Sequence, residues 1–150
     1  MITNYPVLNH EDLLLLRSFL KENNLPYNDI QLEGNRFFLY ISGGTIAGCG
    51  GLEFYGDYCL LRSVAVAKDL RGDGYGKEIV QDLISRAADR PLWSISLLTD
   101  TAEKFFEKHF GFKKQSRENA PVEIKTSSEF SSVCPASAVF MTLEIMHPSK

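Results

Sequence analysis

Apolar residues recur every three to four positions near the start of the chain, which predicts an amphipathic helix over residues 10–23. The helix begins after Asn9, whose side chain is a favourable N-cap. It ends at Leu25-Pro26, because proline disfavours helical geometry in the residue before it. The apolar residues that share one face are Leu13, Leu16, Phe19 and Leu20.

Three stretches rich in aromatic and β-branched residues follow and predict strands over 36–41, 45–54 and 58–67. Glycine-containing turns at 43–44 and 56–57 separate them, as in hairpins. The glycines inside the second stretch, which weaken its strand tendency, are Gly48, Gly50 and Gly51. Strands joined by such short turns predict an antiparallel meander.

Beyond Val66 the pattern alternates between helical and strand periods. Helices are expected over 74–89 and 101–109, the first stopped by Pro91 and the second closed near Gly111. The other expected elements are strands over 92–98, 112–115 and 136–145, and a loop with a turn or two of helix over 121–132. The whole order predicts an α+β fold with a mixed central sheet and helices on both faces.

Composition and charge restrict the classes of function. A length of 150 residues with 44% hydrophobic residues suits one compact domain over residues 1–150. A net charge of -3 without a Lys/Arg run argues against a nucleic-acid partner. The purely apolar runs, such as Leu13–Leu16, are too short to cross a membrane, and Glu11 and Asp12 interrupt any early secretory signal. Three cysteines without a CxxC pair indicate reduced thiols, so we expect a cytoplasmic protein without a metal site.

The segment with the clearest chemical signal joins the third strand to the second helix and reads Arg71-Gly72-Asp73-Gly74-Tyr75-Gly76-Lys77. Successive backbone N–H groups in a glycine-rich loop point into one concavity and bind anions. The helix N-terminus adds unpaired N–H groups and a partial positive charge, and Arg71 and Lys77 can add charge-assisted contacts. This environment suits a pyrophosphate.

Two common nucleotide motifs do not match this loop. The dinucleotide fingerprint is G-x-G-x-x-G in a parallel βαβ unit, whereas the spacing here is G-x-G-x-G after antiparallel strands. The mononucleotide P-loop ends in G-K-[ST], whereas this chain continues Gly76-Lys77-Glu78 and lacks the hydroxyl that holds magnesium. The sequence therefore favours a different pyrophosphate ligand.

The pattern R-x-x-G-x-G after a V-A-V strand resembles the first cofactor motif of the GNAT superfamily of N-acetyltransferases. Leu97-Leu98-Thr99 and Phe110-Gly111-Phe112 are similar to the second cofactor motif of that superfamily. Over nearly the whole chain the sequence also resembles a GNAT branch found in arsenic-resistance contexts, and amino-acid N-acetyltransferases of the glutamate-acetylating type. The segments that carry this wider resemblance are Leu25-Pro26 with Asp29, Gly51-Leu52-Glu53, Leu60–Val66, Leu97-Leu98-Thr99 and Cys134–Ala138.

The resemblance implies acetyl-CoA as co-substrate and a central sheet that is splayed where the coenzyme binds. The pantetheine arm would pair with the backbone of Val64, Ala65 and Val66, and the pyrophosphate would lie on residues 71–77. The second motif would flank the coenzyme through Thr101, Ala102 and Phe105. The implied reaction is acetyl transfer to the amine of a small amino-acid-like molecule, by direct attack in a ternary complex.

The chemistry needs an unprotonated amine, so a base that accepts its proton helps the attack. Glu53 is the candidate base, because it lies on the strand next to Leu61–Val66, and the alternative is a surface carboxylate at the sheet edge. Arg62 and Ser63 are candidate substrate-binding residues, since the planar guanidinium could hold a substrate carboxylate. Alternatively, Arg62 faces solvent or pairs with a carboxylate such as Glu53, which would change the base assignment. A backbone N–H near Val64 would stabilise the oxyanion.

The residues of the second motif leave alternatives to this interpretation open. Many GNAT enzymes supply a tyrosine that protonates the leaving thiolate, whereas this chain has Phe105-Phe106 in that region. The alternatives are a protein lysine or N-terminal acetyltransferase, a non-catalytic acyl-CoA sensor and a scaffold. The cysteines are expected to be small buried residues, Cys134 included. An exposed C-terminal strand could also pair two copies into a homodimer.

Overall fold

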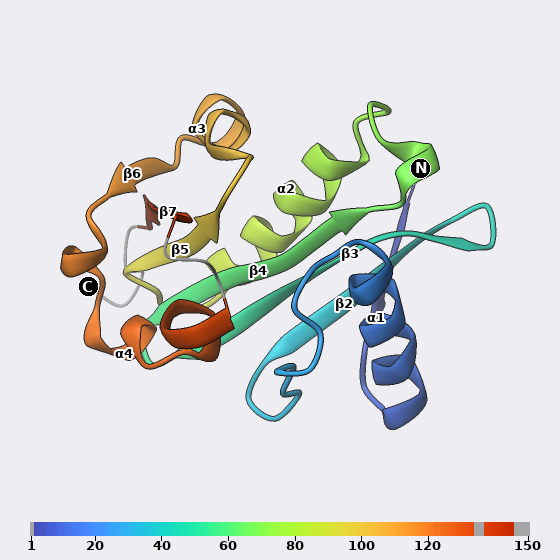
Figure 1. The fold of residues 1–150 in the computed structure, drawn as a ribbon, viewed down its shortest axis with the longest axis horizontal. Helices are drawn as coiled ribbons and strands as arrows, with labels where there is room; N and C mark the ends of the chain where they lie inside the picture. The colour runs from blue at the N-terminus through green and yellow to red at the C-terminus, as the bar shows by residue number, and fades with distance from the viewer. Residues whose placement is uncertain (1, 134–136, 146–150) are drawn as a thin grey trace. The chain divides into compact units, whose positions relative to one another are not determined.

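The computed structural model describes residues 2–133 and 137–145. The strands form a seven-stranded, mostly antiparallel sheet in the order β1-β2-β3-β4-β5-β7-β6 (Figure 1). The chain divides into two compact units, one of Met1–Glu53 and Arg62–Leu83, the other of Phe54–Leu61 and Ile84–Lys150. Strands β3 and β4 and helix α2 each contribute residues to both units.

The first unit contains the antiparallel strands and two helices. Its elements are β1 (Thr3–Pro6), α1 (His10–Glu22), β2 (Arg36–Ser42), most of β3 (Thr45–Tyr55), the end of β4 (Tyr58–Val66), η1 (Lys68–Leu70) and most of α2 (Tyr75–Ala88). The expected strands and helices of this region are confirmed to within one residue. Asn9 accepts a hydrogen bond from the Asp12 N–H at 2.8 Å and is the N-cap of α1, as predicted.

Strand β1 was not expected from the sequence. It pairs with β2 in antiparallel register, from Thr3 opposite Ile41 to Pro6 opposite Phe38. Three of its four residues are exposed and one is proline, so it carries no alternating apolar pattern. Its pairing partner, rather than its own composition, makes it a strand.

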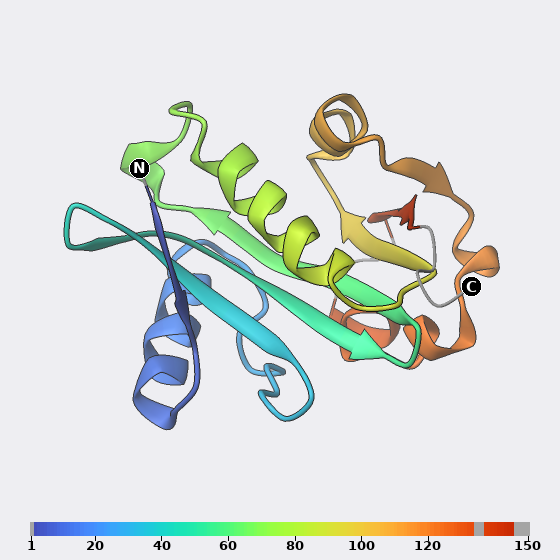
Figure 2. The same cartoon turned by 180° about the vertical axis from the view of Figure 1, so that it is seen from behind.

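Helices α1 and α2 cover opposite faces of this part of the sheet (Figures 1 and 2). On β3, Cys49 belongs to the apolar cluster of α1, whereas Gly48 and Gly50 face α2. A Cβ atom at Gly48 would lie 2.5 Å from Ile79 Cδ1 and 2.6 Å from the Ala65 carbonyl oxygen. Two of the three glycines that weaken the strand on propensity alone, Gly48 and Gly50, are therefore the residues that let α2 approach β3 closely.

The second unit contains the end of β3, the start of β4, the end of α2 and the remaining elements. These are β5 (Ser94–Thr99), α3 (Glu103–Phe110), β6 (Lys113–Gln115), η2 (Arg117–Asn119), α4 (Val122–Lys125), η3 (Glu129–Val133) and β7 (Val139–Glu144). Strand β5 runs parallel to β4 and antiparallel to β7. Gly111, with φ of 77°, ends α3 as predicted.

The final strand corrects one expectation. β7 is hydrogen-bonded to β5 on one side and to β6 on the other. The premise that an exposed C-terminal strand could pair two copies is therefore wrong, because both edges of β7 are already paired within the unit. A homodimer would need another surface.

The described residues also bear on the membrane, metal and cysteine expectations. None of the helices in 2–133 and 137–145 is long and apolar enough to cross a bilayer. The same residues bring together no group of three or more His, Cys, Asp or Glu side chains that could hold a metal ion. The side chains of Cys49 and Cys59 are fully buried, which confirms their expected place in the core. Cys134 lies outside the described residues.

Candidate active site

The backbone of β4 is irregular at Ser63, whose φ is 61°. A left-handed backbone costs a residue with a Cβ atom about 1–2 kcal/mol, so the surroundings must hold it in place. Such a residue inside a strand is typical of a β-bulge, which re-aims the neighbouring groups. Ser63 and the two residues that flank it, Arg62 and Val64, are all among the predicted site residues.

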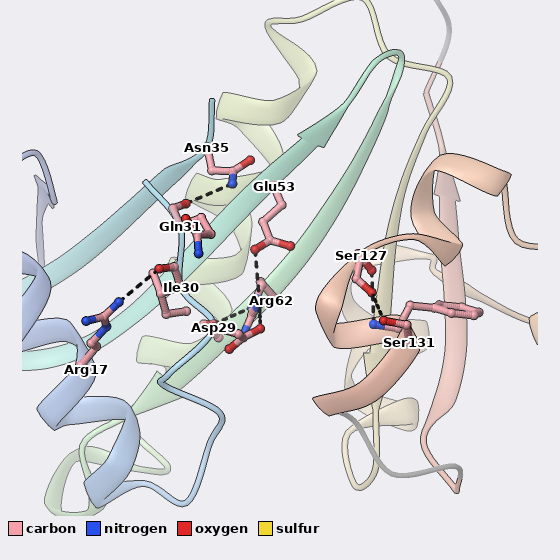
Figure 3. Close-up of polar contacts among 11 residues, drawn as sticks. Arg17, Asp29, Ile30, Gln31, Asn35, Glu53, Arg62, Ser127 and Ser131 are labelled. Carbon is pink, nitrogen blue, oxygen red and sulfur yellow. Dashed lines mark hydrogen bonds and ion pairs between the residues drawn. The ribbon is translucent and has the colours of Figure 1, made fainter. Parts of the chain in front are cut away.

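Arg62 is buried and bonded to acidic side chains on two sides (Figure 3). Its guanidinium donates two hydrogen bonds to Asp29, with Nη1–Oδ2 at 2.6 Å and Nη2–Oδ1 at 2.9 Å. It donates a third to Glu53, with Nη1–Oε2 at 3.2 Å, and a fourth from Nε to the Ser63 hydroxyl at 3.0 Å. The two predicted substrate-binding residues and the predicted base thus form one network, with Asp29 added.

The arrangement matches the alternative in which Arg62 pairs with Glu53. The side chains of Arg62 and Glu53 are only 1% and 3% exposed, whereas Asp29 is 15% exposed. A buried arginine needs paired acceptors, and two carboxylates around one guanidinium leave the network with a net negative charge. A proton transferred to Glu53 would compete with its bond to Arg62.

Asp29 is the member of this network whose pairing the sequence did not predict. It lies in the connection between α1 and β2, far from Arg62 in sequence. A signal was available, because an arginine inside the apolar run 60–66 must find a carboxylate when the strand is buried. The sequence does not say which of the 19 acidic residues supplies it.

Cys49 lies beside the same irregular point of β4. Its thiol donates to the Ser63 carbonyl oxygen, with Sγ–O at 3.1 Å, and the Ala65 backbone is hydrogen-bonded to its sulfur. Burial raises the pKa of the Cys49 thiol far above its ordinary value, despite the opposing effect of the Ala65 bond. The thiol is therefore protonated, and available as a donor, at neutral pH.

The main chain of β4 alternates in direction beyond the irregular point. The Ala67 N–H donates to the Ala47 carbonyl of β3 at 2.8 Å, and the Ala65 carbonyl lies against Gly48 of β3. The Val66 carbonyl instead accepts a bond from Arg71 Nε at 3.1 Å. Of the residues predicted to pair with pantetheine, Ala65 thus turns toward β3 and Val66 turns away from it.

The glycine-rich loop is exposed, and it enters α2 at Tyr75. Gly72 and Gly74 have φ of 90° and 86°, and a Cβ atom on either would meet nothing within 4 Å. Glycine is therefore needed for backbone conformation, in addition to the close anion approach expected from the sequence. The Arg71 guanidinium bonds to Val66 and to Asn23 Oδ1 at 2.9 Å, and the Tyr75 hydroxyl lies 3.2 Å from Ser42 Oγ.

Next to Arg71 the first unit has an open pocket of about 460 Å³. Asn23, the partner of Arg71, is one of its lining residues. The others are Phe19, Glu22, Ala67, Lys68 and Asp69. The sequence interpretation assigned no role to this pocket.

The predicted second cofactor motif lies in the second unit. Thr101 is exposed, and the Ala102 N–H donates to Thr99 Oγ1 at 3.0 Å just before α3 begins. The Phe105 ring packs edge-on against Phe106, with ring centroids 5.2 Å apart. These residues form a helix entry followed by an aromatic cluster, and the loop Arg71–Lys77 belongs to the other unit.

Comparisons with known proteins match most of the chain to one family. The model of the acetyltransferase (GNAT) family matches residues 7–112. The amino-acid acetyltransferase of Mycobacterium tuberculosis is 33% identical over 111 residues, which cover 71% of this chain. The chain spans about 60% of that relative's length.

Solved structures with low sequence identity share the fold and confirm the expected α+β class. N-acetylglutamate synthase from Neisseria gonorrhoeae, complexed with coenzyme A and N-acetyl-glutamate, matches 97% of this chain and 35% of its own with a TM-score of 0.74 and 15% identity. The ribosomal-protein-S18-alanine N-acetyltransferase of Escherichia coli matches 97% of this chain and 95% of its own, with a TM-score of 0.73 and 19% identity. Their names give two different acceptors on one fold, so the fold does not select the acceptor.

Proposed function

The chain belongs to the GNAT acetyltransferase family, and from this membership we propose that it transfers an acetyl group from acetyl-CoA to the amine of a small amino-acid-like molecule in the cytoplasm. The free amine attacks the thioester carbonyl in a ternary complex, the C–N bond forms, and the C–S bond breaks to release coenzyme A. The observation that carries the proposal is the left-handed Ser63 and its buried Arg62 network, eight residues before a loop with left-handed glycines.

The coenzyme would be held mainly by backbone groups. Val64, Ala65 and Val66 would face the pantetheine arm, and the N–H groups of Gly72 to Lys77 would surround the pyrophosphate. Arg71 already bonds to Val66 and Asn23, which suits it to fixing the loop as well as to contacting phosphate. Thr101, Ala102 and Phe105 of the second cofactor motif would also contact the coenzyme.

Glu53 remains the candidate base although it pairs with Arg62: it would accept the proton of the attacking amine, either directly or through a water molecule, in competition with that bond. Its bond to Arg62 holds the carboxylate in one orientation, which favours a defined path for that proton. The leaving thiolate needs no tyrosine in this scheme, because a thiol pKa near 8.5 makes its unassisted departure tolerable.

Arg62 would recognise the carboxylate of the acceptor. Its fork is occupied by Asp29, so a substrate carboxylate would have to displace Asp29 or share the guanidinium with it. Asp29 is the most exposed member of the network, which makes it the partner that is easiest to displace. The Ser63 hydroxyl completes the proposed substrate site.

A thiol-release assay with acetyl-CoA tests the proposal against amino acids, polyamines and phosphinothricin-like or arsinothricin-like compounds. We expect Glu53→Gln to lower kcat by about 10²-fold or more. We expect Arg62→Ala to raise KM for acceptors with a carboxylate more than for simple amines. Glu33→Gln, an exposed carboxylate outside the network, is the matched control.

The results separate the competing functions. Heat from coenzyme A in calorimetry without thiol release from any amine would favour an acyl-CoA sensor, and no heat at all would end the acetyltransferase proposal. A protein amine is the second candidate acceptor, because the fold shared with the Escherichia coli ribosomal-protein-S18-alanine N-acetyltransferase does not select the acceptor. Mass spectrometry of intact proteins incubated with acetyl-CoA would detect that activity.

A further inference from the structure

The Cys49 thiol contacts the main chain of β4 on both sides of Val64. Its Sγ lies 3.1 Å from the Ser63 carbonyl oxygen, to which it donates, and the Ala65 backbone bonds to the same sulfur. The side chain is fully buried. Two consecutive peptide groups, Ser63–Val64 and Val64–Ala65, are therefore held by one sulfur atom.

These contacts fix the direction of the groups that belong to Val64 itself. In a trans peptide the carbonyl oxygen and the amide hydrogen point in opposite directions, and the described residues contain no cis peptide. Because the Ser63 carbonyl points toward Sγ, the Val64 N–H points away from it. Because the Ala65 N–H points toward Sγ, the Val64 carbonyl also points away.

We propose that Cys49 is a positioning residue for acetyl transfer, which orients the Val64 N–H so that this group can stabilise the oxyanion formed at the thioester carbonyl. The proposal rests on the proposed function and deepens it. Val64 is the residue at which an oxyanion donor is expected, and it directly follows the left-handed Ser63.

The chemistry of the site favours a thiol in this role. A left-handed serine relaxes unless its neighbours hold it, and the Cys49 bond engages its carbonyl while Arg62 engages its hydroxyl. Accepting a bond at the carbonyl also polarises the N–H of the same peptide, which makes that N–H a better donor. Burial keeps the thiol protonated, so this bond persists across the working pH range.

The test compares Cys49→Ala, which removes the donor, with Cys49→Ser, which keeps one. Cys59→Ala is the matched control, because it removes a second fully buried thiol, one that lies on β4 itself but outside the irregular point. We expect Cys49→Ala to lower kcat about tenfold or more, while KM for acetyl-CoA and the calorimetric Kd for coenzyme A stay within about twofold. Cys49→Ser should keep kcat within about threefold of the parent, and so should Cys59→Ala.

A merely structural role predicts a different pattern. Loss of packing would weaken coenzyme A binding and lower the unfolding temperature together, and would do so in Cys59→Ala as well. An unchanged kcat in Cys49→Ala, or a loss shared equally between kcat and coenzyme A affinity, would overturn the proposal. Should Cys49→Ala fail to fold, Cys49→Val, which is close to cysteine in volume and also lacks a donor, takes its place with the same expected and the same overturning results.

A second measurement separates this inference from the proposed function. The amide resonance of Val64 in a ¹⁵N-labelled sample reports the hydrogen bond at the Ser63 carbonyl without any turnover. A shift of that resonance in Cys49→Ala but not in Cys59→Ala supports the positioning of the Val64 N–H by Cys49, even if the parent acetylates none of the amines offered. A Val64 resonance that does not move refutes it whatever the parent's activity.

Discussion

At the residue scale, the buried charges around Arg62 depend on one another. Removing the guanidinium leaves Asp29 and Glu53 without the cation that both of them bond. Breaking a buried ion pair from one side costs about 3–5 kcal/mol. We expect Arg62→Ala to lower the free energy of unfolding by about that amount in urea denaturation. Adding Asp29→Asn and Glu53→Gln should restore part of the loss, and purely additive losses would show that the three side chains do not interact.

Ser63 offers a second prediction, which separates backbone strain from the lost hydroxyl. Ser63→Ala and Ser63→Gly both remove the acceptor of Arg62 Nε, but only glycine adopts φ of 61° without cost. We expect the glycine variant to be more stable than the alanine variant by about 1 kcal/mol. The same urea measurement checks it, and an alanine variant at least as stable as the glycine variant would mean that the bulge is unstrained.

Cys49 makes a prediction about pH. Its folded pKa is raised, so the thiol stabilises the fold fully below the unfolded value of about 8.5, and this stabilisation is lost as the pH rises above it. The free energy of unfolding of the parent should fall above pH 8.5, with up to about 1.4 kcal/mol per pH unit due to this thiol. Cys49→Ser should lack that part of the slope, and parallel pH curves for the two proteins would contradict the assignment.

At the element scale, α2 is held close to β3 by residues without side chains. A Cβ atom at Gly48 would meet the Ala65 carbonyl at 2.6 Å, whereas one at Gly50 would meet only the end of the Leu83 side chain at 2.5 Å. Backbone cannot move aside as a flexible side chain can, so Gly48→Ala should be the costlier change. We expect a loss of about 2–3 kcal/mol for Gly48→Ala and about 1 kcal/mol for Gly50→Ala in thermal or urea unfolding.

Gly48 lies next to Ala65, one of the residues that would contact the coenzyme. The KM for acetyl-CoA therefore gives an independent check on the comparison of Gly48→Ala with Gly50→Ala. Gly48→Ala pushes on the Ala65 carbonyl and should also raise KM for acetyl-CoA, whereas Gly50→Ala should leave it unchanged. Equal losses of stability in the two variants would mean that β4 shifts as easily as the Leu83 side chain.

The elements were largely predictable because their patterns are local. The helix from His10, the three meander strands and α2 follow apolar periodicity and turn residues that the sequence displays directly. Strand β1 was missed because only its partner β2 makes it a strand, and the pairing of β7 on both sides depends on contacts distant in sequence.

The candidate site was predictable only in part, for the same reason. The sequence identifies the loop Arg71–Lys77 as an anion-binding site and suggests, as one alternative, that Arg62 pairs with Glu53. It does not reveal that Asp29 completes that pair or that Cys49 reaches Ser63, because both contacts join residues brought together only by the folded sheet. The sequence predicts that the loop containing Gly72 and Gly74 binds an anion, but only the structure shows that both glycines have a positive φ.

At the scale of the whole molecule, coenzyme binding should stabilise the fold. A ligand at 100 times its Kd adds about 2.7 kcal/mol to the free energy of unfolding, provided that it binds the folded state alone. We expect a matching rise in Tm with coenzyme A, and its loss in Gly74→Val, where φ of 86° excludes a β-branched residue. Gly34→Val is the control, because Gly34 is also left-handed, at 76°, but lies outside the loop. A Tm rise that survives Gly74→Val would place the coenzyme elsewhere.

Asp29 belongs to a connection between elements, whereas Arg62 and Glu53 belong to the sheet. Connections accept insertions and substitutions far more readily than strands do. The acidic partner of Arg62 can therefore be exchanged by grafting another sequence between α1 and β2, without rebuilding the strands. Variants of this chain could change their acceptor specificity through that segment alone. A library randomised between α1 and β2 is therefore the place to search for activity on new amines.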